Sequence, residues 1–395
     1  MKQFISNHFL PVCIGIGVVC ALAVVLVVAG MKKDKNKNTP ADINNTQAVT
    51  PSAAVASKPT DAPTDAPTDT PTPELPTETP TPTPDPHAGM VRSALTNEWI
   101  SKEIDETRPI AVMMNNLLPG TPQSNINKAG VVYELKVEGN ITRLLAIIED
   151  WKGLDKIGSV RSARKTYVFL QMEWDPIYLH FGSSNVAQPF LNRADVLNLD
   201  GMQYEGKVYY RSTDRKAPHN AYASAEGILW GVEHKKYSLE HADHYVRDHF
   251  KFAADDTPTL LSDGQDARIV RPGYQENTPW FQYNADDGLY YRFQYGKEHI
   301  DNVDNKQITC KNVILQYCAS EVVDDSGHKV FTIHGTGNGY FITNGKAVPI
   351  TWKKNGDYDP TRFYYQNGEE IQLNTGKTWI CIVRKQDVGT VKIEP

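Results

Sequence analysis

The sequence predicts an α+β protein, with a globular head carried on a transmembrane helix and a disordered stalk. Three observations indicate this fold class. Residues 11–30 are apolar and uncharged, residues 31–88 are dominated by Pro, Thr, Asp and Ala, and the rest of the chain alternates apolar runs with turn residues. Twenty apolar residues match the thickness of a bilayer core. The second segment has too few apolar side chains to offset its chain entropy, so we expect it to stay disordered.

The amino-terminal region predicts a membrane location. We expect an uncleaved anchor at residues 11–30, because the apolar run is longer than the core of a usual signal peptide; a cleaved signal peptide ending near Ala29 is the alternative. The lysines that follow the span would place the head in the cytoplasm by the positive-inside rule. We expect the opposite, a single-pass protein with its head at the cell surface, because a Pro-rich stalk is an extended spacer. The segments that we predict are a short tail at 1–10, the anchor at 11–30, the stalk at 31–88, an α+β domain at 89–260 and a β-rich domain at 265–395.

The charge of the chain indicates which class of partner is expected. The net charge is −6, and residues 89–395 carry 35 Lys and Arg against 39 Asp and Glu. This balance argues against nucleic acid as a partner, which would favour a basic excess.

Cys310 and Cys318 lie eight positions apart in one apolar run, beyond disulfide reach on a strand. We expect buried free thiols, and a bridge from either residue to Cys381 is the alternative.

Within residues 89–260, apolar runs with the periodicity of a β-strand alternate with runs that have the periodicity of an α-helix, as in an α+β domain. Alternation over 129–139 places Val131, Tyr133, Leu135 and Val137 on one face of a strand, and Gly139-Asn140 predicts a hairpin turn after it. Further strands are predicted at 108–114, 141–149 and 177–181. Helices are predicted at 157–174, from apolar residues on one stripe, and at 186–197 and 225–234.

After Asp266 the pattern changes to short β-rich runs separated by Gly, Asn and Asp turns. Dipeptides such as Asp287-Gly288 and Asn344-Gly345 are typical of hairpins. We predict strands at 280–284, 289–294, 312–317, 329–334, 339–342, 362–365 and 378–383. The head is therefore expected to be an α+β portion followed by a β-rich portion.

Several motifs resemble the YerB-like family, which carries the DUF3048 domain. They are RPIAVMMNN, VVYELKVEGNITRLLAI, KIGSVRSAR, YLHFGSS and RKAPHNAY, with GTGNGYFITNGKAVPITWKK and GEEIQLNTGKTWI resembling the family's carboxyl-terminal domain. The resemblance covers about residues 105–385 and implies a layered head with two β-sheets and helices on one side. It also implies a cell-surface location, since members are typically predicted lipoproteins of Gram-positive bacteria. This chain differs in having an apparent membrane helix in place of the lipid-modified Cys, and the family implies no established reaction.

The main candidate for a binding site is the segment from Ile157 to Lys165, IGSVRSARK. We expect Ser159 to cap a helix, whose free N–H groups and dipole favour an anion. Arg161 and Arg164 would then project from one helix face, and paired guanidinium groups suit a phosphate or a carboxylate. The alternative is a solvated face, or internal salt bridges to Glu134 and Glu138.

Other candidate residues lie in the loop at 211–220, around the hairpin at 134–143, and at the end of the strand at 177–181. His180 is at a strand end, where ligands bind in open sheets, although a satisfied core histidine is the alternative. For His219 the alternative is a turn histidine bonded to backbone. The ligand-binding residues that we predict are Arg143, Arg161, Arg164, His180, Arg211, Arg215, His219 and Asn220.

No metal site and no cofactor are predicted. Residues 240–249 (EHADHYVRDH) are rich in ligand side chains, with His244 and Asp248 four positions apart. They lack a clear third ligand, so we expect a solvated helix or irregular segment. The sequence has no dinucleotide-binding or phosphate-loop motif, and the closely spaced glycines at 335–339 are expected to form a turn or bulge because no helix follows them.

Two functions follow from these candidates. The first is a membrane-anchored binding protein for an anionic or glycan ligand of the cell envelope, such as a cell-wall polymer, or for an envelope protein, with Arg161 and Arg164 as main contacts. The alternative is a hydrolase or transferase acting on an envelope glycopolymer. In it Glu134, Glu138 or His219 would act as acid or base, and the arginines would stabilise negative charge. The sequence alone does not decide whether the protein is an enzyme.

Overall fold

The computed structural model describes residues 85–395. The predicted tail, the predicted anchor and nearly all of the predicted stalk lie outside the described residues. No helix within residues 85–395 is long and apolar enough to cross a membrane.

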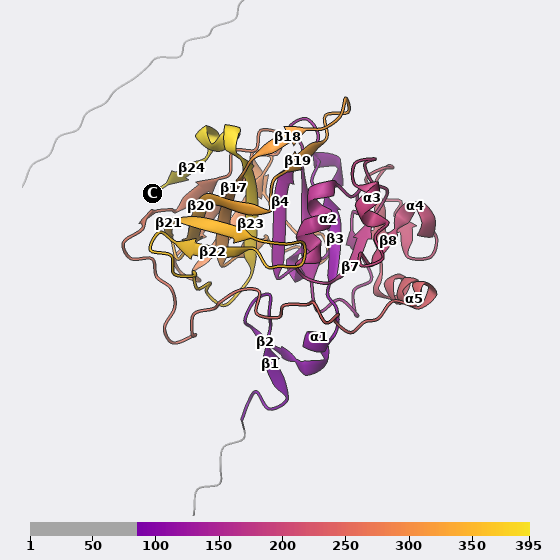
Figure 1. Cartoon of the computed structure of the whole chain (residues 1–395), viewed down its shortest axis with the longest axis horizontal. Coiled ribbons are helices and arrows are strands. Elements are labelled where there is room, and N and C mark those ends of the chain that lie inside the picture. Colours follow the sequence, from indigo (N-terminus) through magenta and orange to yellow (C-terminus); the bar gives the residue numbers. More distant parts are fainter. Residues whose placement is uncertain (1–84) are drawn as a thin grey trace, which may run out of the picture. The chain divides into compact units, whose positions relative to one another are not determined.

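A mixed sheet of eleven strands forms the centre of the described residues (Figure 1). β23 runs parallel to both β17 and β4, so a strand from near the end of the chain joins strands from both predicted domains. The boundary between residues 260 and 265 stays a prediction. In spatial order the strands are β11 (Gln265–Asp266), β21 (Lys346–Lys354), β20 (Gly335–Thr343), β17 (Asn312–Cys318), β23 (Thr378–Arg384), β4 (Val131–Lys136), β5 (Thr142–Ile148), β3 (Ile110–Asn115), β7 (Ile177–His180) and β8 (Asn198–Asp200), with β22 (Arg362–Tyr365) paired to β21.

A second sheet and three small ones complete the β-structure of residues 85–395. The second sheet holds β15 (Lys297–Glu298), β14 (Leu289–Gln294), β13 (Trp280–Asn284), β12 (Ile269–Arg271) and β24 (Lys392–Glu394), with β16 (Thr309–Cys310) paired to β14. The small sheets are β6 (Ile157–Gly158), β10 (Ala221–Ala223) and β9 (Tyr209–Arg211); β1 (Met90–Arg92) and β2 (Trp99–Ser101); and β18 (Ser320–Val322) and β19 (Lys329–Phe331). The helices are α1 (Lys102–Glu106), α2 (Lys165–Met172), α3 (Gln188–Leu191), α4 (Gly201–Tyr204) and α5 (Ala225–Lys235).

Each face of the central sheet carries its own hydrophobic core, because successive strand residues point to opposite faces. On one face, Tyr133 of β4 packs in a cluster with residues of α2. On the other face, Val132 packs in a cluster with Phe281 of the second sheet and Ile228 of α5. The placement of helices on one side is therefore corrected: α2 and α5 pack against opposite faces.

Most predicted strands are confirmed. β13, β14 and β22 have the predicted bounds, and β4 and β5 form the predicted hairpin. The four alternating residues of the 129–139 run are all buried in one cluster. β21 was missed, since its run KAVPITWKK contains Pro349, which is rare inside strands. The three cysteines of the described residues are buried free thiols, as expected.

The predicted helices are confirmed in part. α5 covers the whole range predicted at 225–234 and extends one residue beyond it. Of the helix predicted at 186–197, only the four residues of α3 are helical, and Pro189 lies in the first turn. The helix predicted at 157–174 begins only at Lys165, and this change alters the candidate site directly.

Candidate functional site

Four strands end along one edge of the central sheet. β7 runs parallel to β3 and to β8, and β5 lies antiparallel between β3 and β4. The carboxyl ends of β4, β3, β7 and β8 therefore meet at one edge, at Lys136, Asn115, His180 and Asp200. Ligands of open α/β sheets bind beyond such strand ends. A ligand-binding site is therefore expected at this edge of the central sheet.

Residues 158–164 cross this edge as extended chain. The backbone N–H groups of Val160, Arg161 and Ala163 donate to carbonyl groups of three neighbouring segments at 2.8 to 2.9 Å. These groups cannot also form helical hydrogen bonds, so α2 begins at Lys165. The prediction that Ser159 caps a helix is wrong: its buried hydroxyl finds no partner within residues 85–395.

Without that helix, the two arginines of the motif have different surroundings. Arg164 forms a two-pronged bond to Glu138, with Nε to Oε2 at 2.9 Å and Nη2 to Oε1 at 2.8 Å. Arg143 joins the same carboxylate at 2.9 Å. Burial raises the pKa of Glu138, but the two guanidinium groups outweigh burial and hold that pKa below its ordinary value. Internal salt bridging, one alternative for Arg164, is therefore confirmed at Glu138.

Arg161 has no such carboxylate. Its half-buried side chain makes one hydrogen bond, from Nη1 to the carbonyl of Pro218 at 3.1 Å, and no Asp or Glu oxygen of the described chain lies within 4.0 Å of it. Burial and the charges of Arg164 and Arg211 lower the pKa of Arg161 and outweigh the more distant carboxylate of Glu138, which raises it. Burial and Arg164 likewise lower the pKa of Arg143, to about 9. The guanidinium groups thus lie close enough to repel one another.

The loop at 211–220 contributes two further arginines that lie near Arg143, Arg161 and Arg164. Arg211 pairs with Glu205 at 2.8 Å and lies over the ring of Phe181 at 4.4 Å. Arg215 donates to two backbone carbonyls of the 120–122 loop at 2.7 and 2.6 Å. We call these five side chains the arginine cluster: Arg143, Arg161, Arg164, Arg211 and Arg215.

His219 sits among the arginines as a neutral ring. Asn115 Oδ1 accepts from the N–H of Leu117, so its Nδ2 faces His219 Nδ1 at 2.8 Å and donates to it. The ring proton is then on Nε2. Burial, Arg161 and Arg215 lower the pKa of His219. A neutral imidazole with a free Nε2–H can donate one hydrogen bond to an anion.

Two further predicted residues have internal partners. Asn220 accepts from Arg211 at 3.2 Å and donates to the carbonyl of Ser212 at 2.9 Å. His180 is 1 % exposed, and its ring nitrogens lie 2.9 Å from Gly182 O and 3.2 Å from Asn198 Oδ1. His180 is therefore the satisfied core histidine of the alternative interpretation. It also borders a cavity of about 450 Å³, lined mainly by polar side chains, at the ends of β7 and β8.

Glu134, the main candidate acid or base, is fully enclosed. It is 0 % exposed and pairs with Arg292 of β14 at 2.8 Å, with both side chains completely buried. Sequence reasoning missed Arg292; the signal was its place between the inward-facing Tyr290 and Gln294 in an alternating strand. The remaining donors to the Glu134 carboxylate are Asn116, Thr142, Asn277 and Trp379, at 2.9 to 3.2 Å.

Residues 240–249 are irregular rather than helical, because they wrap around Asp175. The N–H of Ala242 donates to Asp175 Oδ2 at 2.8 Å, and His241 Nδ1 lies 3.2 Å from the same oxygen. Arg108 pairs with the other carboxylate oxygen. No group of three or more His, Cys, Asp or Glu side chains in residues 85–395 is arranged to hold a metal ion.

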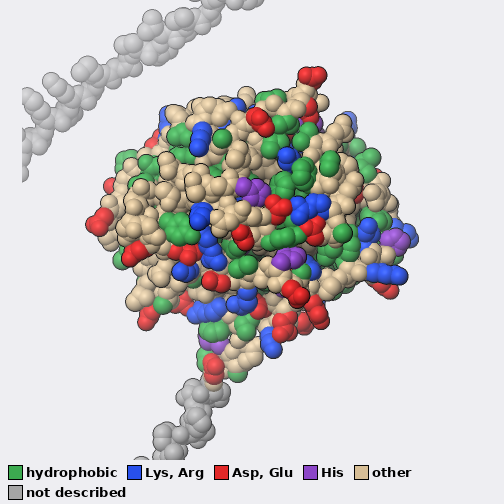
Figure 2. All heavy atoms as spheres, viewed as in Figure 1, with side chains coloured by type: hydrophobic (Ala, Val, Ile, Leu, Met, Phe, Trp, Pro, Cys, Tyr) green, Lys and Arg blue, Asp and Glu red, His purple; other side chains and the backbone are tan. Residues whose placement is uncertain are grey.

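Charge is evenly mixed over the face shown in Figure 2. Lys and Arg side chains alternate there with Asp and Glu and with apolar groups. Attraction of an anion by this face as a whole would be weak, since opposite charges cancel over the screening distance. A local group such as the arginine cluster is therefore the kind of place where an anion would bind.

The fold and this edge define an α+β protein built on one mixed sheet, with a second sheet packed across one face. The DUF3048 N-terminal domain, of unknown function, matches residues 95–238, and the DUF3048 C-terminal domain matches residues 270–380. The chain belongs to the DUF3048 family.

Two comparisons agree with this family. YerB of Bacillus subtilis (strain 168), whose name describes it as a candidate lipoprotein, is 29% identical over 315 residues, which cover 77% of this chain and 89% of YerB. The crystal structure of the YerB protein from Bacillus subtilis has a TM-score of 0.67 at 27% identity, and the match covers 77% of this chain and 100% of that chain. The resemblance seen in the sequence motifs is confirmed.

Proposed function

We propose that this protein binds an anionic ligand of the cell envelope at the arginine cluster, with Arg161 as the chief contact. The ligand class is a phosphate or carboxylate group, such as those of a charged wall glycopolymer. The predicted anchor and stalk would hold the binding head at the cell surface. The name of YerB as a candidate lipoprotein supports a membrane-attached surface location for this relative too.

One observation carries the proposal. Arg161 is a half-buried guanidinium group beside other cations, with one backbone acceptor and no carboxylate oxygen of residues 85–395 within 4.0 Å. Placing a cation there costs free energy unless an opposite charge compensates it. A bound anion would accept from the free N–H groups of Arg161 and from His219 Nε2. Charge-assisted bonds of this kind contribute about 1.5 to 3 kcal/mol each.

The enzymatic alternative receives no comparable support. Glu134 is 0 % exposed, with its oxygens occupied by internal donors. Glu138 is held by Arg143 and Arg164. A general acid or base must reach the proton that it transfers; Glu134 has no such approach, and both oxygens of Glu138 are engaged by guanidinium groups. His219 remains a candidate for hydrogen bonding to the ligand.

The test is binding of purified anionic wall polymer, and of inorganic phosphate, to the full-length protein. We expect Arg161→Ala to weaken binding about tenfold or more, the effect of losing about 1.5 kcal/mol. Added salt should also weaken binding by the wild type, because the contact is electrostatic.

The matched control is Arg268→Ala, since Arg268 is exposed and forms no side-chain hydrogen bond or ion pair in the described residues. Its binding should equal that of the wild type. A second readout is the pKa of His219 followed by NMR, which should rise when phosphate binds. Equal affinity of Arg161→Ala and wild type for both probes would overturn the proposal.

A further inference from the structure

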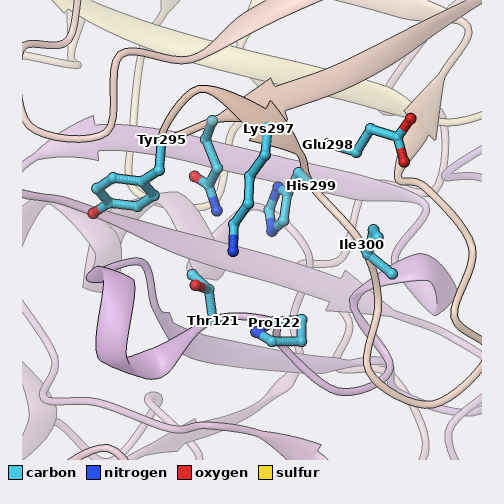
Figure 3. A pocket seen from close by; sticks show the side chains of 8 residues that line it. Thr121, Pro122, Tyr295, Lys297, Glu298, His299 and Ile300 are labelled. Carbon is cyan, nitrogen blue, oxygen red and sulfur yellow. The ribbon is translucent and has the colours of Figure 1, made fainter.

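A separate pocket lies under the hairpin that joins β14 and β15. Its walls are Thr121 and Pro122 on one side and residues 294–300 on the other, and its volume is about 100 Å³ (Figure 3). An engineered cavity of about 150 Å³ holds a benzene molecule, so this pocket has room for a small group of a few heavy atoms. It shares no lining residue with the arginine cluster.

The hairpin places two hydrogen-bond donors side by side. Tyr295 and Gly296 both have positive φ, at 54° and 74°, as a type I′ turn requires. Gln294 and Lys297 are therefore directly opposite partners in the register, and such pairs project their side chains on the same face. The hydroxyl of Tyr295 donates to the carbonyl of Asn116 at 2.9 Å, which holds the turn in place.

Gln294 carries an unused donor in this wall. The residue is 2 % exposed, and its Oε1 accepts from Asn277 at 3.2 Å. Its Nε2 finds no acceptor anywhere in residues 85–395. A buried amide without a partner is unfavourable, so this group would stabilise an acceptor brought within its reach.

The pocket is lined by one cation, Lys297, and one carboxylate, Glu298. Lys297 directs its ammonium group toward Thr121 and Pro122, whereas the carboxylate of Glu298 points away (Figure 3). Lys297 forms no ion pair or side-chain hydrogen bond in the described part of the chain. His299 is occupied: Gln123 Oε1 lies 2.6 Å from its Nε2, and Arg292 donates to its other nitrogen.

From these features we infer that the pocket binds a small carboxylate attached to a short aliphatic group. The carboxylate would accept from Gln294 Nε2 and pair with Lys297, and the aliphatic part would lie against Pro122 and Ile300. A phosphate fits less well, because a dianion with no apolar part would meet one cation and largely apolar walls. The same chemistry could come from a free short-chain acid or from the terminal residue of a peptide.

The test is titration of the full-length protein with sodium propionate, N-acetyl-L-alanine and the corresponding neutral amide, followed by calorimetry. We expect saturable binding of at least one acid and about tenfold weaker binding of the amide, which lacks the charge. Binding of propionate but not of N-acetyl-L-alanine would indicate that the ligand is a free acid. Binding of N-acetyl-L-alanine but not of propionate would indicate that it is the terminal residue of a peptide. In protein with ¹⁵N-labelled glutamine, the side-chain amide signal of Gln294 should shift on binding.

Lys297→Gln should weaken binding about tenfold, and Lys392→Gln, at an exposed lysine of β24, should not. Gln294→Met should also weaken binding; if that variant fails to fold, the amide signal in the wild type decides the same point. Arg161→Ala should leave the binding of propionate unchanged, which separates this pocket from the arginine cluster. The inference is overturned if neither acid saturates, if acid and amide bind equally, or if Arg161→Ala abolishes the effect.

Discussion

Two arginines, Arg292 and Arg161, show two ways of placing a cation in this protein. Arg292 is completely buried and pairs with Glu134 between the two sheets. Arg161 is half-buried at the edge of the central sheet and has one backbone acceptor. The first charge is compensated within the chain, so its role is structural. The second has no carboxylate oxygen within 4.0 Å among the described residues, and because of this difference we propose Arg161 as the contact for a ligand.

The largest effect should come from breaking the compensated pair. Glu134→Ala leaves the Arg292 guanidinium buried without its carboxylate, and such a change costs about 3 to 5 kcal/mol of unfolding free energy. Chemical denaturation of the full-length protein measures this cost. The double variant Glu134→Leu with Arg292→Met should recover much of the loss, because it removes both charges together. A single variant as stable as wild type would refute the structural role.

A smaller effect separates the two arginines of the IGSVRSARK motif. Arg164→Ala removes the two-pronged bond to Glu138 and should lower the unfolding free energy by about 1 to 3 kcal/mol. Arg161→Ala removes one hydrogen bond and should change the unfolding free energy by no more than about 0.5 kcal/mol. Thermal unfolding of both variants beside the wild type measures the contrast. Equal losses would mean that Arg161 is as structural as Arg164.

The last effect appears only as a dependence on pH and concerns a carboxylate without a cation. Burial raises the pKa of Glu149 from 4.5 to about 7, although Ser93 donates a hydrogen bond to it. The folded protein therefore binds more protons than the unfolded chain between about pH 4.5 and 7, and the contribution of Glu149 to stability falls as pH rises through this window. Glu149→Gln should flatten this part of the pH–stability curve. An unchanged slope would contradict the assignment to Glu149.

Much of the fold could be predicted from local patterns. Alternation identified β4, and turn dipeptides separated β13 from β14, because these signals lie within a few residues of one another. The order of the central sheet could not be predicted in this way. The pairing of β23 with β4 joins residues about 250 positions apart, and no local signal records it.

The site was predicted by composition and corrected by geometry. The motif contained two arginines that the structure places in the arginine cluster, but its apolar spacing suggested a helix at residues that are bonded as extended chain. Tertiary hydrogen bonds override propensity in such segments. The pocket under the β14–β15 hairpin was not predicted, because its walls combine residues near 121 with residues near 295.

The position of β23 has a consequence for biosynthesis. This strand lies between β4 and β17 in the middle of the sheet, yet residues 378–384 are synthesised after both of these strands. Until they emerge, two strands with open hydrogen-bonding edges lack their shared neighbour, and such edges readily associate with other chains. A premature stop codon near residue 377 should therefore give an insoluble product rather than a shortened but working head.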